Sequence, residues 1–165
     1  MLPAISRRYL LNALEGTPDV VERLLKNLAL ANPIWDFRPD AARFTAREIV
    51  AHLADWEVVV GERARRTLIE NEPLLPSWDE TQAAVEGDYA RADPNESLRR
   101  FRNGRAATLS ILNQIAEDDW QRVAFREGIG EMSLEGQVVL AAGHDGYHTR
   151  QIAQWLEAWE NWNTR

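Results

Sequence analysis

Two histidines stand four residues apart near the end of the chain, in the stretch HDGYHTRQIAQW that begins at His144. Residues i and i+4 of an α-helix share a face and rise about 6 Å apart, so His144 and His148 can turn their imidazoles toward one metal ion. The only other histidine, His52, lies in IVAHLADWE, where the apolar spacing also predicts a helix. If the two helices are neighbours, the three imidazoles can meet at one ion.

Ordinary packing is the competing interpretation of the same histidines. A histidine on the apolar face of a helix often lies in the core with its ring hydrogen-bonded to a carbonyl, and the HxxxH spacing alone is a weak signal. Burying an imidazole without any partner costs about 1–3 kcal/mol, so each of the three rings needs a ligand or a hydrogen bond. The spacing by itself leaves the metal site and the packing interpretation balanced.

Helix breakers divide the rest of the chain into the elements that would position these rings. Gly16 is expected to end a first short helix that begins at Ile5, and Thr17 and Pro18 are expected to start the next one. Thr45 and Glu48 form a T-x-x-E capping box at the start of the helix that carries His52. Four long helices are predicted, over about 17–31, 45–71, 93–117 and 133–162.

The connections between these helices are unequal. The region from Leu74 to Pro94 is irregular, with a short helix expected near Asp79 to Tyr89. No segment shows sustained strand alternation, although the residues 121–130 could be extended. We therefore predict an all-α fold, an antiparallel four-helix bundle with an irregular connection between helices two and three, forming a single domain over residues 1–165.

Composition narrows the classes of function. The net charge of −7 and the pI near 5.0 argue against a nucleic-acid partner. The absence of cysteine excludes thiolate ligands and a cysteine nucleophile. No apolar run approaches the length of a membrane helix and the first residues lack the order of a signal peptide, so a cytoplasmic protein with no membrane partner is expected. Seven tryptophans in so small a chain also suggest a homodimer.

Three stretches of the chain resemble the DinB superfamily, also called DinB/YfiT-like, a family of four-helix-bundle metalloproteins. They are WDFRPDAARFTAREIVAHLADWE, which begins at Trp35, SLRRFRNGRAATLSILNQIAEDDW, which begins at Ser97, and GEMSLEGQVVLAAGHDGYHTRQI, which begins at Gly130. The last contains the pattern H-D-x-x-H-x-x-Q-I of the family's final helix. The resemblance spans most of the chain and implies that His52, His144 and His148 are metal ligands.

Three neutral imidazoles suit first-row divalent ions, zinc or nickel before iron or manganese. Three protein ligands leave positions open for water or substrate, which is typical of a catalytic site. The resemblance implies a hydrolase or a transferase that depends on a low-molecular-weight thiol, acting on a small molecule. A metal-binding or stress-response protein without turnover is the alternative, and a helical interaction module whose histidines only pack is a third.

Four more residues are assigned to the site by helix geometry. Asp55 lies three residues after His52, and Gln151 three after His148, so each can accept a hydrogen bond from an imidazole N–H. Trp56, one turn after His52, and Asp145 are placed at the pocket wall or rim, although a plain core tryptophan and a surface or inter-helix polar contact are the commoner roles for residues in these positions. The sequence identifies no acid–base residue.

Overall fold

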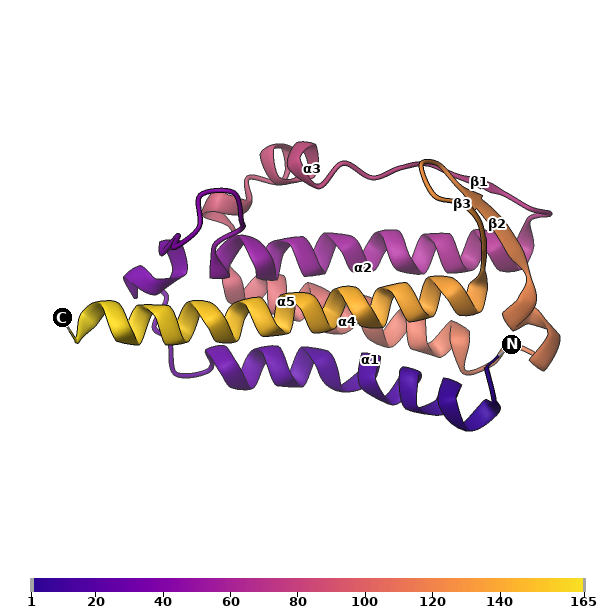
Figure 1. The fold of residues 1–165 in the computed structure, drawn as a ribbon, viewed down its shortest axis with the longest axis horizontal. Coiled ribbons are helices and arrows are strands. Elements are labelled where there is room, and N and C mark those ends of the chain that lie inside the picture. Colours follow the sequence, from indigo (N-terminus) through magenta and orange to yellow (C-terminus); the bar gives the residue numbers. More distant parts are fainter. Residues whose placement is uncertain (1, 165) are drawn as a thin grey trace.

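Four long helices form the body of the molecule, as the sequence predicted (Figure 1). In a computed structural model that describes residues 2–164, these helices are α1 (Ala4–Leu25), α2 (Ala46–Ile69), α4 (Pro94–Leu112) and α5 (Leu134–Asn163). The connection between α2 and α4 contains the short helix α3 (Glu80–Glu86), close to where one was expected. Within residues 2–164, no helix combines the length and apolarity that crossing a membrane requires.

The helix directions differ from the antiparallel bundle that we predicted. Side-chain contacts pair Asp55 of α2 with Arg100 of α4 and then Glu57 with Arg105, so the numbers rise together and these helices are parallel. Figure 1 shows the reason, since residues 70–93 run back along the bundle before α4 begins. Fully extended at about 3.3 Å each, these residues reach about twice the length of α2, which is roughly 36 Å at 1.5 Å per residue. The contacts of His52 with His144 and of Thr67 with Gln137 make α2 and α5 antiparallel. Figure 1 shows α1 and α5 running in the same direction.

Helix α1 is continuous from Ala4 to Leu25, so the predicted break at Gly16 and Thr17 is wrong. Proline inside a helix has no N–H for the carbonyl four residues earlier, which normally destabilises the helix. Here the carbonyl left free by Pro18 belongs to Leu14, and Nη1 of Arg105 from α4 donates a hydrogen bond to it. A tertiary contact thus replaces the missing backbone bond and allows the helix to pass through the proline.

A small sheet at one end of the bundle was missed by the all-α prediction. Strand β1 (Leu74–Leu75) pairs in parallel with β2 (Val123–Arg126), and β2 pairs antiparallel with β3 (Gly130–Ser133). The turn between β2 and β3 places Gly128 and Gly130 at φ of 79° and 101°, which glycine tolerates readily. The extended alternative considered for residues 121–130 is therefore the better description of part of that stretch.

Helices α2 and α4 approach closely at two glycines. A Cβ atom on Gly61 would lie 2.9 Å from Oγ1 of Thr108, and one on Gly104 would lie 3.0 Å from Cγ of Glu57. A side chain at either position would force the neighbouring Thr108 or Glu57 side chain to shift. The close approach brings Glu57 within reach of Arg105, which is the centre of the buried polar layer described next.

A buried polar layer crosses the middle of the bundle and separates two apolar clusters. One cluster contains the start of α2 and the end of α1, with Ile49, Leu53 and Phe101 fully buried. The other gathers at the opposite end around Leu109 and Leu134. The side chains of the layer are among the most buried polar groups of the chain: His52, Glu57, Arg105, Asp145, His148 and Gln151. Because polar groups in the core must meet one another, this layer fixes the relative position of the helices along the bundle axis.

Candidate metal centre

The start of α2 is held in place before it delivers His52. Oγ1 of Thr45 accepts the N–H of Glu48 at 3.3 Å, and the Glu48 carboxylate accepts the N–H of Thr45 at 2.7 Å. This is the capping box that the sequence predicted. Arg38 adds two hydrogen bonds of 2.7 Å to the same carboxylate. His52 follows one turn further along and is fully buried.

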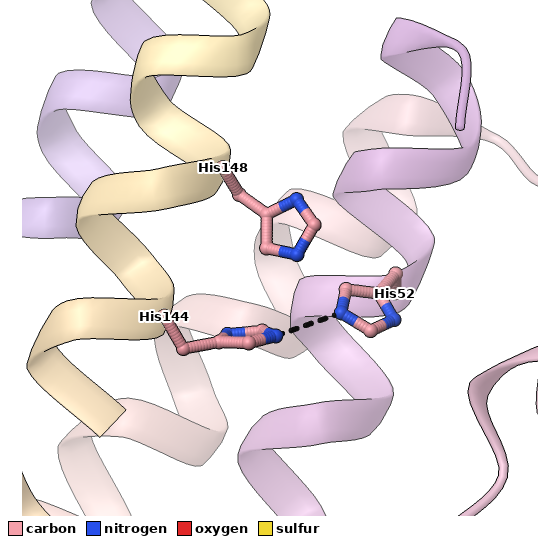
Figure 2. Close-up of side chains that lie close together, drawn as sticks. All are labelled: His52, His144 and His148. Carbon is pink, nitrogen blue, oxygen red and sulfur yellow. Dashed lines mark hydrogen bonds between the residues drawn. The ribbon is translucent and has the colours of Figure 1, made fainter. Parts of the chain in front are cut away.

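The three histidine rings gather at one point between α2 and α5 (Figure 2). Nε2 of His52 lies 2.9 Å from Nε2 of His144, and the His148 ring is centred 4.6 Å from His52 and 4.5 Å from His144. One ring nitrogen from each residue lies within 4.8 Å of the others. The antiparallel run of α2 and α5 brings together residues 92 positions apart in the sequence. The structure therefore juxtaposes the three residues that the spacing singled out.

The three imidazoles have the protonation state that metal ligands need. Burial lowers the pKa of His52 to about 2, with the neighbouring His148 and His144 adding to the effect. Burial likewise lowers the pKa of His144 to about 3 and that of His148 to about 4. All three rings are neutral near pH 7 and each offers a lone pair.

The arrangement fits one small divalent ion. The contact between His52 and His144 uses only two of the rings, whereas a metal ion would use all three. Two nitrogens bound at about 2.05 Å to a tetrahedral ion lie roughly 3.3 Å apart, so the His52–His144 pair, at 2.9 Å, is within a few tenths of an ångström of that spacing. All three donor nitrogens lie within 4.8 Å of one another, so the third can reach the same ion after a larger shift. A set of three nitrogen donors suits zinc and the neighbouring transition metals.

Gln151 lies where its sequence position suggested, beside His148. Its Oε1 is 3.1 Å from Nδ1 of His148, and its Nε2 donates to the carbonyl of Phe44 at 3.1 Å. The second bond fixes the amide orientation, so Oε1 faces the ring and Nδ1 must carry the hydrogen. The lone pair of His148 is then on Nε2. For His52 and His144, Nδ1 has no hydrogen-bond partner among residues 2–164.

Two tryptophans cover the histidine cluster. The Trp56 ring is centred 4.8 Å from His144 and 5.4 Å from Trp78, which itself lies 5.4 Å from His52. Trp56 was predicted to wall the pocket, and the structure places it against one of the three rings. Trp78 comes from the irregular connection before α3 and was not singled out, because a lone tryptophan between prolines carries no helical spacing.

Asp55 does not contact the histidines. Its carboxylate accepts a hydrogen bond of 2.8 Å from the Tyr89 hydroxyl and forms an ion pair with Arg100. A residue three positions after His52 lies about 60° around the helix from it, and on α2 this rotation points toward α4 rather than toward α5. The predicted contact between Asp55 and His52 is therefore absent, and nothing in the structure replaces it.

Asp145 also points away from the rings, toward α4. Its Oδ2 accepts a hydrogen bond of 2.7 Å from Arg105, which also donates to Glu57 at 2.6 and 2.8 Å. These three side chains are at most 3 % exposed. Burial raises the pKa of both carboxyl groups, and the charge of Arg105 opposes that change. Asp145 thus belongs to the inter-helix contact that we weighed against a place at the pocket rim.

A cavity of about 350 Å³ opens beside the cluster. His144, His148 and Gln151 line it, together with Arg43 and Tyr147. Arg43 escaped the sequence analysis because it precedes α2 in a connection, where no helical spacing links it to the histidines. Its closeness to them is a property of the fold, since the start of α2 packs against α5.

Comparison with known proteins agrees with the geometry. Residues 13–152 match the family model described as the DinB superfamily. The chain is 27% identical over 145 residues to a protein of Oceanobacillus iheyensis named "Putative metal-dependent hydrolase", covering 86% of this chain and 81% of that protein. It is 31% identical over 111 residues to a protein of Geobacillus thermodenitrificans with the same name, covering 66% of this chain and 62% of the relative. The matches to several such relatives span about three fifths of their length.

A solved structure shares the fold. YfiT from Bacillus subtilis, described as "a probable metal-dependent hydrolase with an unusual four-helix bundle topology", superposes with a TM-score of 0.90. The superposition covers 97% of this chain and 91% of that chain at 19% sequence identity, so the likeness concerns the fold. The bundle with two parallel pairs of neighbouring helices is therefore shared beyond this sequence.

Proposed function

We propose that this chain, which belongs to the DinB superfamily, is a metal-dependent hydrolase that acts on a small molecule at an ion bound by His52, His144 and His148. The observation that carries the proposal is the convergence of three neutral imidazoles beside a cavity of about 350 Å³. Two of the three ligands line that cavity, so a molecule inside it can reach the ion. The relatives named as metal-dependent hydrolases support the same reaction class.

The residues of the chain prepare the site for this chemistry. A divalent ion held by these three imidazoles would leave positions open for water and would lower the pKa of that water toward neutrality. Gln151 fixes the tautomer and orientation of His148 through its bond to Nδ1. Trp56 and Trp78 cover the cluster on one side and limit the access of bulk water to it. The low pKa values of the rings keep them available as ligands at neutral pH.

A three-nitrogen site favours zinc or nickel, followed by iron or manganese. Transfer to or from a low-molecular-weight thiol is the other reaction that the sequence resemblance implied, and it would use the same ligands and the same open position. A homodimer, a cytoplasmic location and a stress-response role stay predictions of the sequence.

Elemental mass spectrometry of the untagged protein tests the proposal. We expect about one divalent ion per chain, lost in His148→Ala, and hydrolysis of small esters or amides that stops when a chelator removes the ion and returns when zinc or nickel is added. Thiol transfer would appear instead as turnover that requires an added thiol. Protein without metal after incubation with zinc, nickel and manganese would overturn the metal site.

Asp55→Asn is the matched control for these measurements. Asp55 is on the same helix as His52 and three residues away, but its carboxylate faces Tyr89 and Arg100. This variant should retain its metal. If Asp55→Asn loses the ion as completely as His148→Ala, the loss reflects general damage to the bundle rather than removal of a ligand.

A further inference from the structure

The cavity beside the histidines contains one arginine that has no acidic partner. Arg43 lines it, directly before α2, and among the residues that the structure describes it forms no ion pair and its side chain donates no hydrogen bond. Its Nε is buried and unpartnered. The neighbouring arginines behave differently, since Arg38 pairs with Glu48 and Arg47 with Asp36. Of the three arginines 38, 43 and 47, Arg43 is therefore the one whose side-chain N–H groups have no hydrogen-bond partner within residues 2–164.

Two aromatic rings hold the Arg43 guanidinium in position. Its central carbon lies 4.7 Å from the centre of the Trp155 ring and 5.3 Å from that of Tyr147. Trp155 is itself fixed, because its indole N–H donates to the carbonyl of Phe44 at 2.8 Å. Stacking on aromatic faces leaves the edges of the planar guanidinium, where its N–H groups lie, free for a partner. A carboxylate or phosphate group, with two oxygens that accept two parallel N–H bonds, is the partner that such a guanidinium fits.

The second charged residue of the cavity does not neutralise Arg43. Glu80 lines the cavity from α3, a helix without buried residues, and its carboxylate is exposed to solvent. Between residues 2 and 164, no ion pair joins Glu80 to Arg43. The cavity thus presents a positioned cation near the candidate metal ligands and an acid that stays in water at its edge.

We propose that this cavity binds a small organic anion, with a carboxylate or phosphate group held by Arg43 while another part of the molecule reaches the three histidines. This inference rests on the proposed function and adds the substrate class to it. His144 and His148 line the same cavity as Arg43, so one small molecule can contact both ends. Tyr147, which is 53% exposed, lies between them at the surface and offers a ring against which the molecule can lie.

Anion binding can be tested without knowing the substrate. Succinate, inorganic phosphate and the neutral diamide succinamide are titrated by calorimetry into wild type, Arg43→Gln and Arg150→Gln, each in metal-free and zinc-loaded form at pH 7.5. Arg150→Gln is the matched control, because it removes the same charge from an exposed arginine two residues after His148 that does not line the cavity. Circular dichroism establishes that each variant is folded.

We expect succinate or phosphate to bind wild type and Arg150→Gln alike, and Arg43→Gln at least 10-fold more weakly, with no binding of succinamide. The anion that binds more tightly identifies the group as carboxylate or phosphate. Binding that is equal in wild type and Arg43→Gln, or absent from both, overturns the inference. Zinc content is measured on the same samples, so failure of anion binding can be told apart from failure of the metal site. The two are independent, because metal-free protein still contains Arg43 and its two stacking rings.

Discussion

Replacing Arg105 by methionine should destabilise the bundle more than any other single arginine change we can name. The guanidinium and the two carboxylates it joins, Glu57 and Asp145, are all at most 3 % exposed, so solvent does not screen them. Breaking a buried ion pair by removing one partner costs about 3–5 kcal/mol. The carbonyl of Leu14, which Pro18 cannot satisfy, also loses its donor and adds about 1 kcal/mol.

The expected loss is therefore about 5 kcal/mol in the free energy of unfolding. The loss in the free energy of unfolding has an upper limit, because the folded variant can remove the buried charges by protonating the two carboxyl groups. At pH 7 this protonation costs about 3–4 kcal/mol per acid. Urea unfolding of metal-free protein, followed by circular dichroism, measures the change. With a denaturant slope of about 2 kcal/mol per M, the midpoint should fall by roughly 2.5 M.

Arg102→Met is the control, because it removes the same kind of interaction from the surface. Arg102 also lies on α4 and also joins two acids, Asp19 and Glu22, but all three side chains are about half exposed. Exposed pairs contribute about 0–1 kcal/mol, so this variant should unfold almost like wild type. If both variants lose the same stability, the buried layer does not have the energetic role assigned to it.

The Arg105→Met deficit should also depend on pH. Burial already raises the pKa of Glu57, and loss of the guanidinium raises it further. The folded variant then binds a proton that the unfolded chain releases above its ordinary carboxyl pKa, so its stability increases as the pH falls from 7 toward 5. The difference in the free energy of unfolding between wild type and Arg105→Met should therefore shrink from pH 7 to pH 5. A difference that stays constant or grows would contradict the reasoning.

Further predictions follow from the same contacts. Pro18→Ala supplies a backbone N–H to the Leu14 carbonyl, which accepts from Arg105 in wild type, so it should stabilise the Arg105→Met variant about 1 kcal/mol more than it stabilises wild type. A double-mutant cycle in urea measures this difference, and additive effects would contradict the idea that Arg105 replaces the missing backbone donor. Gln151→Leu should weaken zinc binding about 10- to 100-fold in competition with a chelating dye, because His148 loses its partner at Nδ1; an unchanged affinity would remove Gln151 from the site. Zinc at 100 times its dissociation constant should raise the free energy of unfolding by about 2.7 kcal/mol, and His52→Ala should abolish this gain.

Local patterns in the sequence predicted most of the helices, and the resemblance to the DinB superfamily implied that the three histidines meet. The capping box at Thr45 and the apolar spacing around His52 are local signals, and α2 obeys them. His144 and His148 needed only helical periodicity to share a face. The continuity of α1 could not be seen in the same way, because the partner of the Leu14 carbonyl comes from residue 105 on another helix.

Features set by distant contacts were the ones that the sequence did not reveal. The parallel run of α2 and α4 depends on the path of residues 70–93, a segment long enough to connect helices of either relative direction. Strands of two to four residues, such as β1 and β3, are too short for alternation to be recognised. Arg43 and Trp78 lie at the site because of packing across the bundle, and Asp55 lies away from it because its position on α2 faces Arg100 and Tyr89.

The position of α5 between α1 and α2 has a consequence for how the protein is made. Residues 134–163 supply two of the three histidines and cover both α1 and α2, so a ribosome-bound chain that ends before them has neither a complete core nor a donor set. The preceding helices then expose the apolar faces that α5 later covers, and such nascent chains are prone to aggregate or to recruit chaperones. If the proposed ion binds, it can meet all three ligands only after synthesis has passed His148.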